Sequence, residues 1–166
     1  MCVLATAAIF APKHAPLLLI AGARGDWITP RELAMEPANA AAVRFGHLTL
    51  ATRDVAATSA FFQATLGFAP IQQPGNIDPV ARWLRIAPQQ ELHLIGVDDF
   101  EPSNFEREYG RHVAFCYPGS QFGELKERLS EHGAEIIAPL RETPFERFFF
   151  RDPNGYIFEI VDSENA

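Results

Sequence analysis

The chain has 166 residues, which is enough for one domain with a hydrophobic core and too few for two ordinary domains. Hydrophobic residues make up 48% and charged residues 21%, a composition that excludes a disordered chain. The net charge of −7 argues against a nucleic-acid partner and against an anionic membrane surface. Two cysteines, Cys2 and Cys116, cannot form a disulfide framework, so we expect a cytoplasmic protein.

Residues 1–43 differ from the rest of the chain. They are rich in Ala and Pro and show no sustained period of 2 or 3.6, which predicts an irregular or disordered N-terminal extension, or upstream sequence read from an early start codon. The apolar run at residues 17–23 is far too short to cross a membrane, and the basic start of a signal peptide is missing. We therefore expect no membrane partner.

The sequence from residue 44 onward predicts a strand, a helix and three further strands. A strand over residues 44–51 is followed by Asp54, a residue type that caps helices, and by a helix over residues 55–66 that Gly67 ends. Three more strands are predicted, separated by Pro, Gly and Asn; they span residues 68–72, 80–86 and 91–97. The order is β-α-β-β-β.

The second half repeats this order. A strand over residues 111–117 precedes Ser120, the expected cap of a helix over residues 121–132, which Gly133 ends. The remaining strands are predicted over residues 135–138, 147–151 and 156–161. Two copies of one unit, at residues 44–98 and 111–163, predict a single α+β domain over residues 44–163.

The repeat places polar residues at equivalent positions. His47 and His112 occupy the first strands and lie 65 residues apart, and the helix-ending glycines lie 66 residues apart. The same offset carries His93, in the last strand of the first unit, onto Glu159, in the last strand of the second. The four residues His47, His93, His112 and Glu159 therefore form a paired set.

These four side chains lie in otherwise apolar strands, where an imidazole or a carboxylate is costly unless it is paired or bound to a metal. A single histidine on a strand is commonly structural, but four polar residues at paired positions favour a site for Zn²⁺, Fe²⁺, Ni²⁺, Co²⁺ or Mn²⁺. Glu91 is an open alternative. It lies two residues before His93, on the same strand face, and could be the ligand in place of His93 or a general base.

Four segments of the chain resemble the vicinal oxygen chelate superfamily, which contains glyoxalases, fosfomycin- and bleomycin-resistance proteins and extradiol dioxygenases. They are the strand His47-Leu48-Thr49-Leu50, the helix end Phe61-Phe62-Gln63-Ala64-Thr65-Leu66-Gly67-Phe68, the strand His112-Val113-Ala114-Phe115, and the segment from Phe149 to Glu159 with its Asp152-Pro153-Asn154-Gly155 turn.

The resemblance implies two tandem βαβββ units that form one open, cup-shaped mixed sheet. It also implies a divalent metal inside the cup on the first and last strands of each unit, which here are the strands of His47, His93, His112 and Glu159. A small-molecule substrate would chelate the ion through neighbouring oxygens, with Glu159 or Glu91 as the proton shuttle. Members of the superfamily often form dimers, sometimes by exchanging units, so we expect a homodimer.

The resemblance leaves three kinds of function open. A metal-dependent enzyme of the glyoxalase I type (lyase or isomerase) or a dioxygenase is favoured, and a carboxylate at Glu91 would match the glyoxalase I pattern. A fosfomycin-type thiol transferase would use His47, His112 and Glu159 together with a basic pocket, for which the candidates are Arg82, Arg85, Arg147 and Arg151. A metal-free binding protein of the bleomycin-resistance type is the non-enzymatic alternative, although such proteins typically lack these ligands.

Overall fold

The structure is a computed structural model that describes residues 20–21, 27–28 and 44–166. Contacts divide the chain into two units, residues 1–44 and residues 45–166. In the first unit, strands β1 (Ile20–Ala21) and β2 (Trp27–Ile28) pair antiparallel. The remainder of the predicted extension lies outside the described residues. Within the described part of the chain, no helix combines the length and the apolar character needed to span a membrane.

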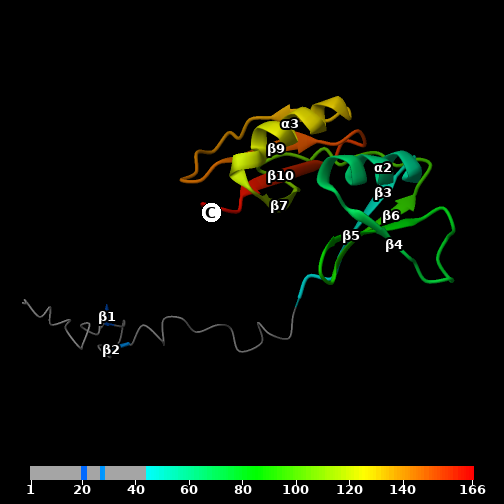
Figure 1. Cartoon of the computed structure of the whole chain (residues 1–166), viewed down its shortest axis with the longest axis horizontal. Coiled ribbons are helices and arrows are strands. Elements are labelled where there is room, and N and C mark those ends of the chain that lie inside the picture. The colour runs from blue at the N-terminus through cyan, green and yellow to red at the C-terminus, as the bar shows by residue number, and fades with distance from the viewer. Residues whose placement is uncertain (1–19, 22–26, 29–43) are drawn as a thin grey trace, which may run out of the picture. The chain divides into compact units, whose positions relative to one another are not determined.

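The second unit contains the βαβββ order twice. The first module consists of β3 (His47–Thr52), α2 (Val55–Leu66), β4 (Ala69–Ile71), β5 (Arg82–Ala87) and β6 (Gln90–Gly96). The second consists of β7 (Val113–Tyr117), the short 3₁₀ turn η1 (Gly119–Gln121), α3 (Phe122–Glu131), β8 (Glu135–Ile137), β9 (Arg147–Arg151) and β10 (Ile157–Asp162). The α+β class and the two tandem modules are confirmed (Figure 1).

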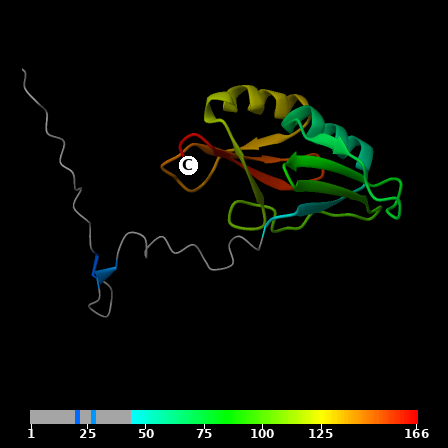
Figure 2. The same ribbon diagram turned by 60° about the horizontal axis from the view of Figure 1, so that its bottom comes forward.

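Each module forms a four-stranded mixed sheet. The strand orders are β3-β6-β5-β4 and β7-β10-β9-β8, so the first and last strands of each module are parallel neighbours. The eight strands are thus hydrogen-bonded as two sheets of four. The two helices lie side by side (Figure 2), and Arg128 of α3 donates a hydrogen bond to the carbonyl oxygen of Thr65 in α2.

Both modules contribute to one hydrophobic core, in which phenylalanine predominates. The ring of Phe62 in α2 meets the ring of Phe158 in β10 edge to face, with centroids 5.5 Å apart. On β9, Phe148 and Phe150 point into the same core. Phenylalanine side chains therefore supply much of the packing, since large aromatic side chains bury much apolar area each.

The ends of α2 follow the sequence closely. Asp54 accepts a hydrogen bond from the backbone N–H of Ala57 at 2.9 Å, and Gly67 ends the helix with a positive φ of 71°. The prediction for α3 was wrong at its start. Ser120 lies in η1, and its hydroxyl and backbone N–H pair with the Glu164 carboxylate instead of capping the helix.

The turn between β9 and β10 joins the two modules. Asn154 of this turn exchanges hydrogen bonds with the buried hydroxyls of Thr52 and Thr58, which belong to the end of β3 and the first turn of α2. Asp152 accepts hydrogen bonds from the backbone N–H groups of Asn154 and Tyr156, which fixes the turn. The Asp-Pro-Asn-Gly segment therefore positions the second sheet against the first module.

Candidate functional site: two half-sites

The polar residues of the first module lie together on one face of its sheet. In β3, Leu48 and Leu50 contact the core, so His47 and Thr49 point to the opposite face. The register places His47 beside Glu91 and Thr49 beside His93 on the adjacent strand β6. We call His47, Glu91 and His93 the first half-site.

The first half-site is a stack of rings beside a carboxylate. The imidazole of His93 lies between the indole of Trp83, at 3.7 Å, and the imidazole of His47, at 4.3 Å between ring centroids. Its Nε2 lies 3.0 Å from Oε2 of Glu91, and an Nη of Arg85 lies 3.5 Å from the other Glu91 oxygen. His93 is thus held on both faces and at one nitrogen, while His47 is exposed at the edge strand.

The second half-site is the pair His112 and Glu159. Nε2 of His112 lies 3.3 Å from Oε2 of Glu159, and the imidazole meets the ring of Phe149 edge to face at 5.3 Å. The Glu159 side chain is only 11% exposed, and Nδ1 of His112 is buried without a hydrogen-bond partner. An imidazole and a carboxylate directed at each other in this way are suitable ligands for a divalent cation.

A buried arginine holds the other oxygen of Glu159. Arg147 donates from one Nη to Oε1 of Glu159 at 2.7 Å, and from the other Nη to Glu108 and to the carbonyl oxygen of Arg141. Burial opposes the charge of Arg147, but the hydrogen bonds to Glu159 and Glu108 outweigh it and raise the pKa of the guanidinium.

Glu108 is the anchor of this network. Its carboxylate also accepts hydrogen bonds from the backbone N–H groups of Leu140 and Arg141. Burial would raise the pKa of Glu108, but the hydrogen bonds from Leu140 and Arg147 outweigh it, so the pKa is lowered. No periodic pattern marks Glu108 in the sequence, because it lies in the connector between the modules, residues 97–112.

The same connector covers the face of the second sheet. The buried carboxylate of Glu106 accepts hydrogen bonds from the backbone N–H of Ile157 and from the side chain of Arg111, the residue before His112. As a result, Phe149 and Ile157 are almost fully buried although they point away from the helices. On the corresponding face of the first sheet, His47 and Thr49 are exposed.

The four predicted ligands stand as two pairs, His47 with His93 and His112 with Glu159. Among the residues that the structure describes, no three His, Cys, Asp or Glu side chains come together as they would around a metal ion. Val113 pairs with Phe158, so His112 falls in line with Ile157, two residues before Glu159. In the first module His47 pairs with Glu91, two residues before His93.

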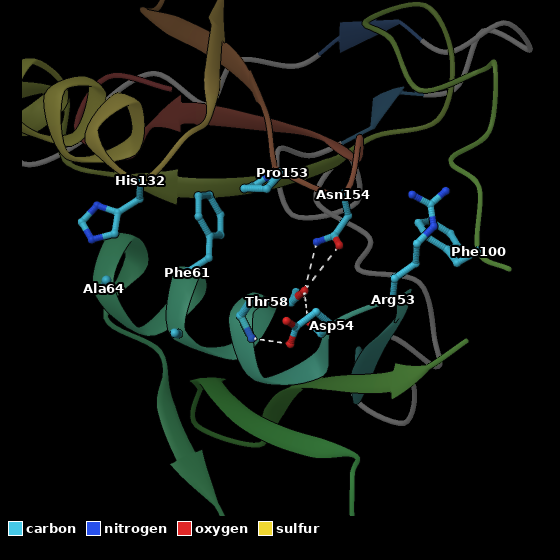
Figure 3. Close-up of a pocket in the computed structure, with 11 residues that line it drawn as sticks. Arg53, Asp54, Thr58, Phe61, Ala64, Phe100, His132, Pro153 and Asn154 are labelled. Carbon is cyan, nitrogen blue, oxygen red and sulfur yellow. Dashed lines mark hydrogen bonds between the residues drawn. The ribbon is translucent and has the colours of Figure 1, made fainter. Parts of the chain in front are cut away.

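The largest of the described cavities lies away from both half-sites. It has a volume of about 680 Å³ and runs along α2 between Arg53 and His132, against Pro153 and Asn154 (Figure 3). None of the predicted ligands lines it. A smaller cavity of about 120 Å³ touches Thr49 and His112.

The phenylalanines of β9 point in two directions. Phe148 and Phe150 belong to the core, whereas Phe149 faces His112.

The four arginines predicted as candidates for a basic pocket all have partners in the structure. Arg82 donates to three backbone carbonyls, Arg85 lies beside Glu91, Arg151 pairs with Glu135, and Arg147 pairs with two carboxylates.

Known proteins share this architecture. The model of the Glyoxalase/Bleomycin resistance protein/Dioxygenase superfamily matches residues 44–160. The chain is 26% identical over 128 residues to Glyoxylase I 4 of Arabidopsis thaliana, covering 72% of this chain and 70% of that protein.

Solved structures agree with this fold. A glyoxalase family protein from Bacillus anthracis superposes with a TM-score of 0.60 at 24% identity, covering 75% of this chain and 96% of the other. The fosfomycin resistance protein FosX from Listeria monocytogenes gives a TM-score of 0.57 at 22% identity, with coverages of 73% and 91%. A mutant of the Listeria protein was solved in complex with Mn(II) and 1S,2S-dihydroxypropylphosphonic acid.

The family match spans well over half of the chain, and it includes both modules and both half-sites. The chain therefore belongs to the Glyoxalase/Bleomycin resistance protein/Dioxygenase superfamily.

Proposed function

We propose that the protein is a divalent-metal-dependent enzyme that acts on a small substrate bound through two neighbouring oxygens. The observation that carries the proposal is the directed pair of His112 Nε2 and Glu159 Oε2, 3.3 Å apart and with Glu159 almost fully buried. Zn²⁺, Fe²⁺, Ni²⁺, Co²⁺ and Mn²⁺ all accept imidazole and carboxylate ligands, so this pair does not select one of them.

We further propose that two copies of the chain complete the site as a homodimer. In this arrangement His47 of one copy joins His112 and Glu159 of the other. Two features support it: one chain brings only two of the predicted ligands together at each half-site, and His47 stands exposed on an open sheet face. His112 keeps 25% of its side chain exposed, which leaves room for a third ligand.

Glu91 is the better candidate for the proton shuttle. One oxygen of Glu159 is fixed by Arg147 and the other faces His112, so Glu159 has little freedom to carry a proton. Glu91 is 25% exposed, lies beside His47 in the register and is oriented by His93. A bound divalent ion would act as a Lewis acid on the substrate oxygens. Glu91 would remove a proton from the substrate carbon that carries one of these oxygens and return it to the carbon that carries the other.

This arrangement favours a lyase or isomerase of the glyoxalase I type. A transferase acting on a phosphonate would need free cations at the site, and each arginine considered for that role already has a partner. An isomerisation that moves a proton between neighbouring carbons requires a proton shuttle beside the place where the substrate binds.

Metal analysis tests the proposal. The chain is purified without chelators, loaded with each candidate metal in turn, and analysed for bound metal as wild type, H112A, E159Q and H47A. We expect about one ion per chain in the wild type and strong loss in the three variants. H132A is the matched control, because His132 lies at the end of α3, where its Nδ1 contacts a backbone carbonyl.

A wild-type chain that binds no metal would overturn the enzyme proposal and favour the metal-free binding protein. With metal bound, turnover of the methylglyoxal–thiol adduct would support the lyase or isomerase. Oxygen uptake with catechols would instead identify a dioxygenase.

A further inference from the structure

Arg147 is a buried residue that lies beside the second half-site. Its side chain is 2% exposed, and the guanidinium carbon lies 5.2 Å from the centroid of the Phe149 ring. That ring in turn meets the imidazole of His112. Phe149 thus contacts both Arg147 and His112, and the hydrogen bond from Arg147 to the second half-site goes to Glu159.

Arg147 is also held by partners other than Glu159. Its second Nη is held by Glu108 and by the carbonyl oxygen of Arg141, and Glu108 is held in turn by two backbone N–H groups. The guanidinium is therefore anchored from the connector side and presents its first Nη to Oε1 of Glu159. A planar fork of this kind fixes a carboxylate better than a lysine could.

The consequence concerns the two oxygens of Glu159. Oε1 is engaged by Arg147, and Oε2 is the oxygen that faces His112. We propose that Arg147, anchored by Glu108, is a positioning residue that holds Glu159 as a one-oxygen ligand directed toward His112. This inference rests on the proposed metal site and deepens it, because it assigns roles to two residues outside the ligand set.

A competing role for Arg147 predicts the opposite change in metal affinity when the arginine is removed. If Arg147 simply competed with a cation for Glu159, removing its charge would strengthen metal binding, because like charges repel. If Arg147 positions Glu159, removing it weakens binding, because partners that orient a metal ligand typically contribute about 10- to 100-fold in affinity.

The test is a Co²⁺ titration of the full chain, followed by absorption spectroscopy, with wild type, R147M, R147K and E108Q. We expect R147M to bind Co²⁺ about 10-fold or more weakly and with an altered spectrum. R147K keeps the charge but loses the fork, so it should also bind more weakly, and E108Q should show a smaller loss. R151M is the matched control on the same strand, because Arg151 pairs with Glu135 at the surface.

Wild-type affinity in both R147K and E108Q, or tighter binding in R147M, would overturn the proposal. If R147M fails to fold, R147K and E108Q decide the question, with melting temperatures measured to identify any loss of structure.

If the wild type binds no Co²⁺, the proposed function fails by itself. The positioning role is then judged in a crystal structure of metal-free R147K, where it predicts that Glu159 turns away from His112. An unchanged Glu159 would contradict it.

Discussion

Asp162 holds the C-terminal end of the second module. Its carboxylate accepts hydrogen bonds from the side chain of Asn165 and from the backbone N–H groups of Glu164 and Gly119. These hydrogen bonds, led by the one from Asn165, outweigh the effect of burial and lower the pKa of Asp162 below its ordinary value of 3.8. The ionised form is therefore favoured in the folded protein.

Because the pKa of Asp162 is lower in the folded than in the unfolded protein, the folded protein becomes less stable as the pH falls. Asp162 stabilises the folded state above its unfolded pKa, and this contribution is lost as the pH falls through the lower folded value. We expect D162N to melt below the wild type near pH 7, with a gap that narrows in acid below about pH 4. Thermal melts from pH 2 to pH 7 measure this, with D99N, a change at an exposed carboxylate, as control. A gap that does not vary with pH would contradict the assignment.

The sequence indicates which single residues are candidate ligands, but not which residues they contact. His47, His93, His112 and Glu159 could be found because the repeat marks them, and Glu91 because it shares a strand face with His93. The anchoring role of Arg147 could not be found in this way. The alternation of β9 does mark Arg147 as lying on the face of Phe149, but its partner Glu108 lies 39 residues away in a connector.

Strands and helices were predicted most closely where local chemistry determines them. The helix over residues 55–66 agrees with α2 because Asp54 and Gly67 act locally at its two ends. Ser120 was a wrong prediction because a distant contact replaces the local one. The backbone N–H of Gly119 bonds to Asp162, and Ser120 bonds to Glu164, both more than 40 residues later.

The contact between the β9–β10 turn and α2 can be tested by a single substitution. N154A removes the hydrogen bonds to Thr52 and Thr58, and it leaves two buried hydroxyls with fewer partners. We expect a loss of about 1–3 kcal/mol in the free energy of unfolding. Urea denaturation measures it, and N104A, a change at an exposed connector position, is the control. Equal stability of the two variants would show that this contact contributes little.

Over the whole chain, the two modules are alike in topology and differ in how their open faces are covered. The connector and the loop before β9 bury the face of the second sheet around Arg147, while the first sheet leaves His47 exposed. The repeat predicted four equivalent ligands, but it could not show that one chain keeps them as two pairs. Pairing across modules depends on how the modules pack, and no local pattern in the sequence specifies that packing.

Subunit complementation tests the proposal that the metal site is shared between two chains. H47A and E159Q chains with different tags are co-expressed, and the mixed dimer is isolated through both tags. One of its sites then combines the intact His47 of the E159Q chain with the intact His112 and Glu159 of the H47A chain. A shared site predicts about one bound ion per mixed dimer, where each parent dimer binds none and the wild type binds about two. A mixed dimer without metal, beside a wild type that binds it, would contradict the shared site.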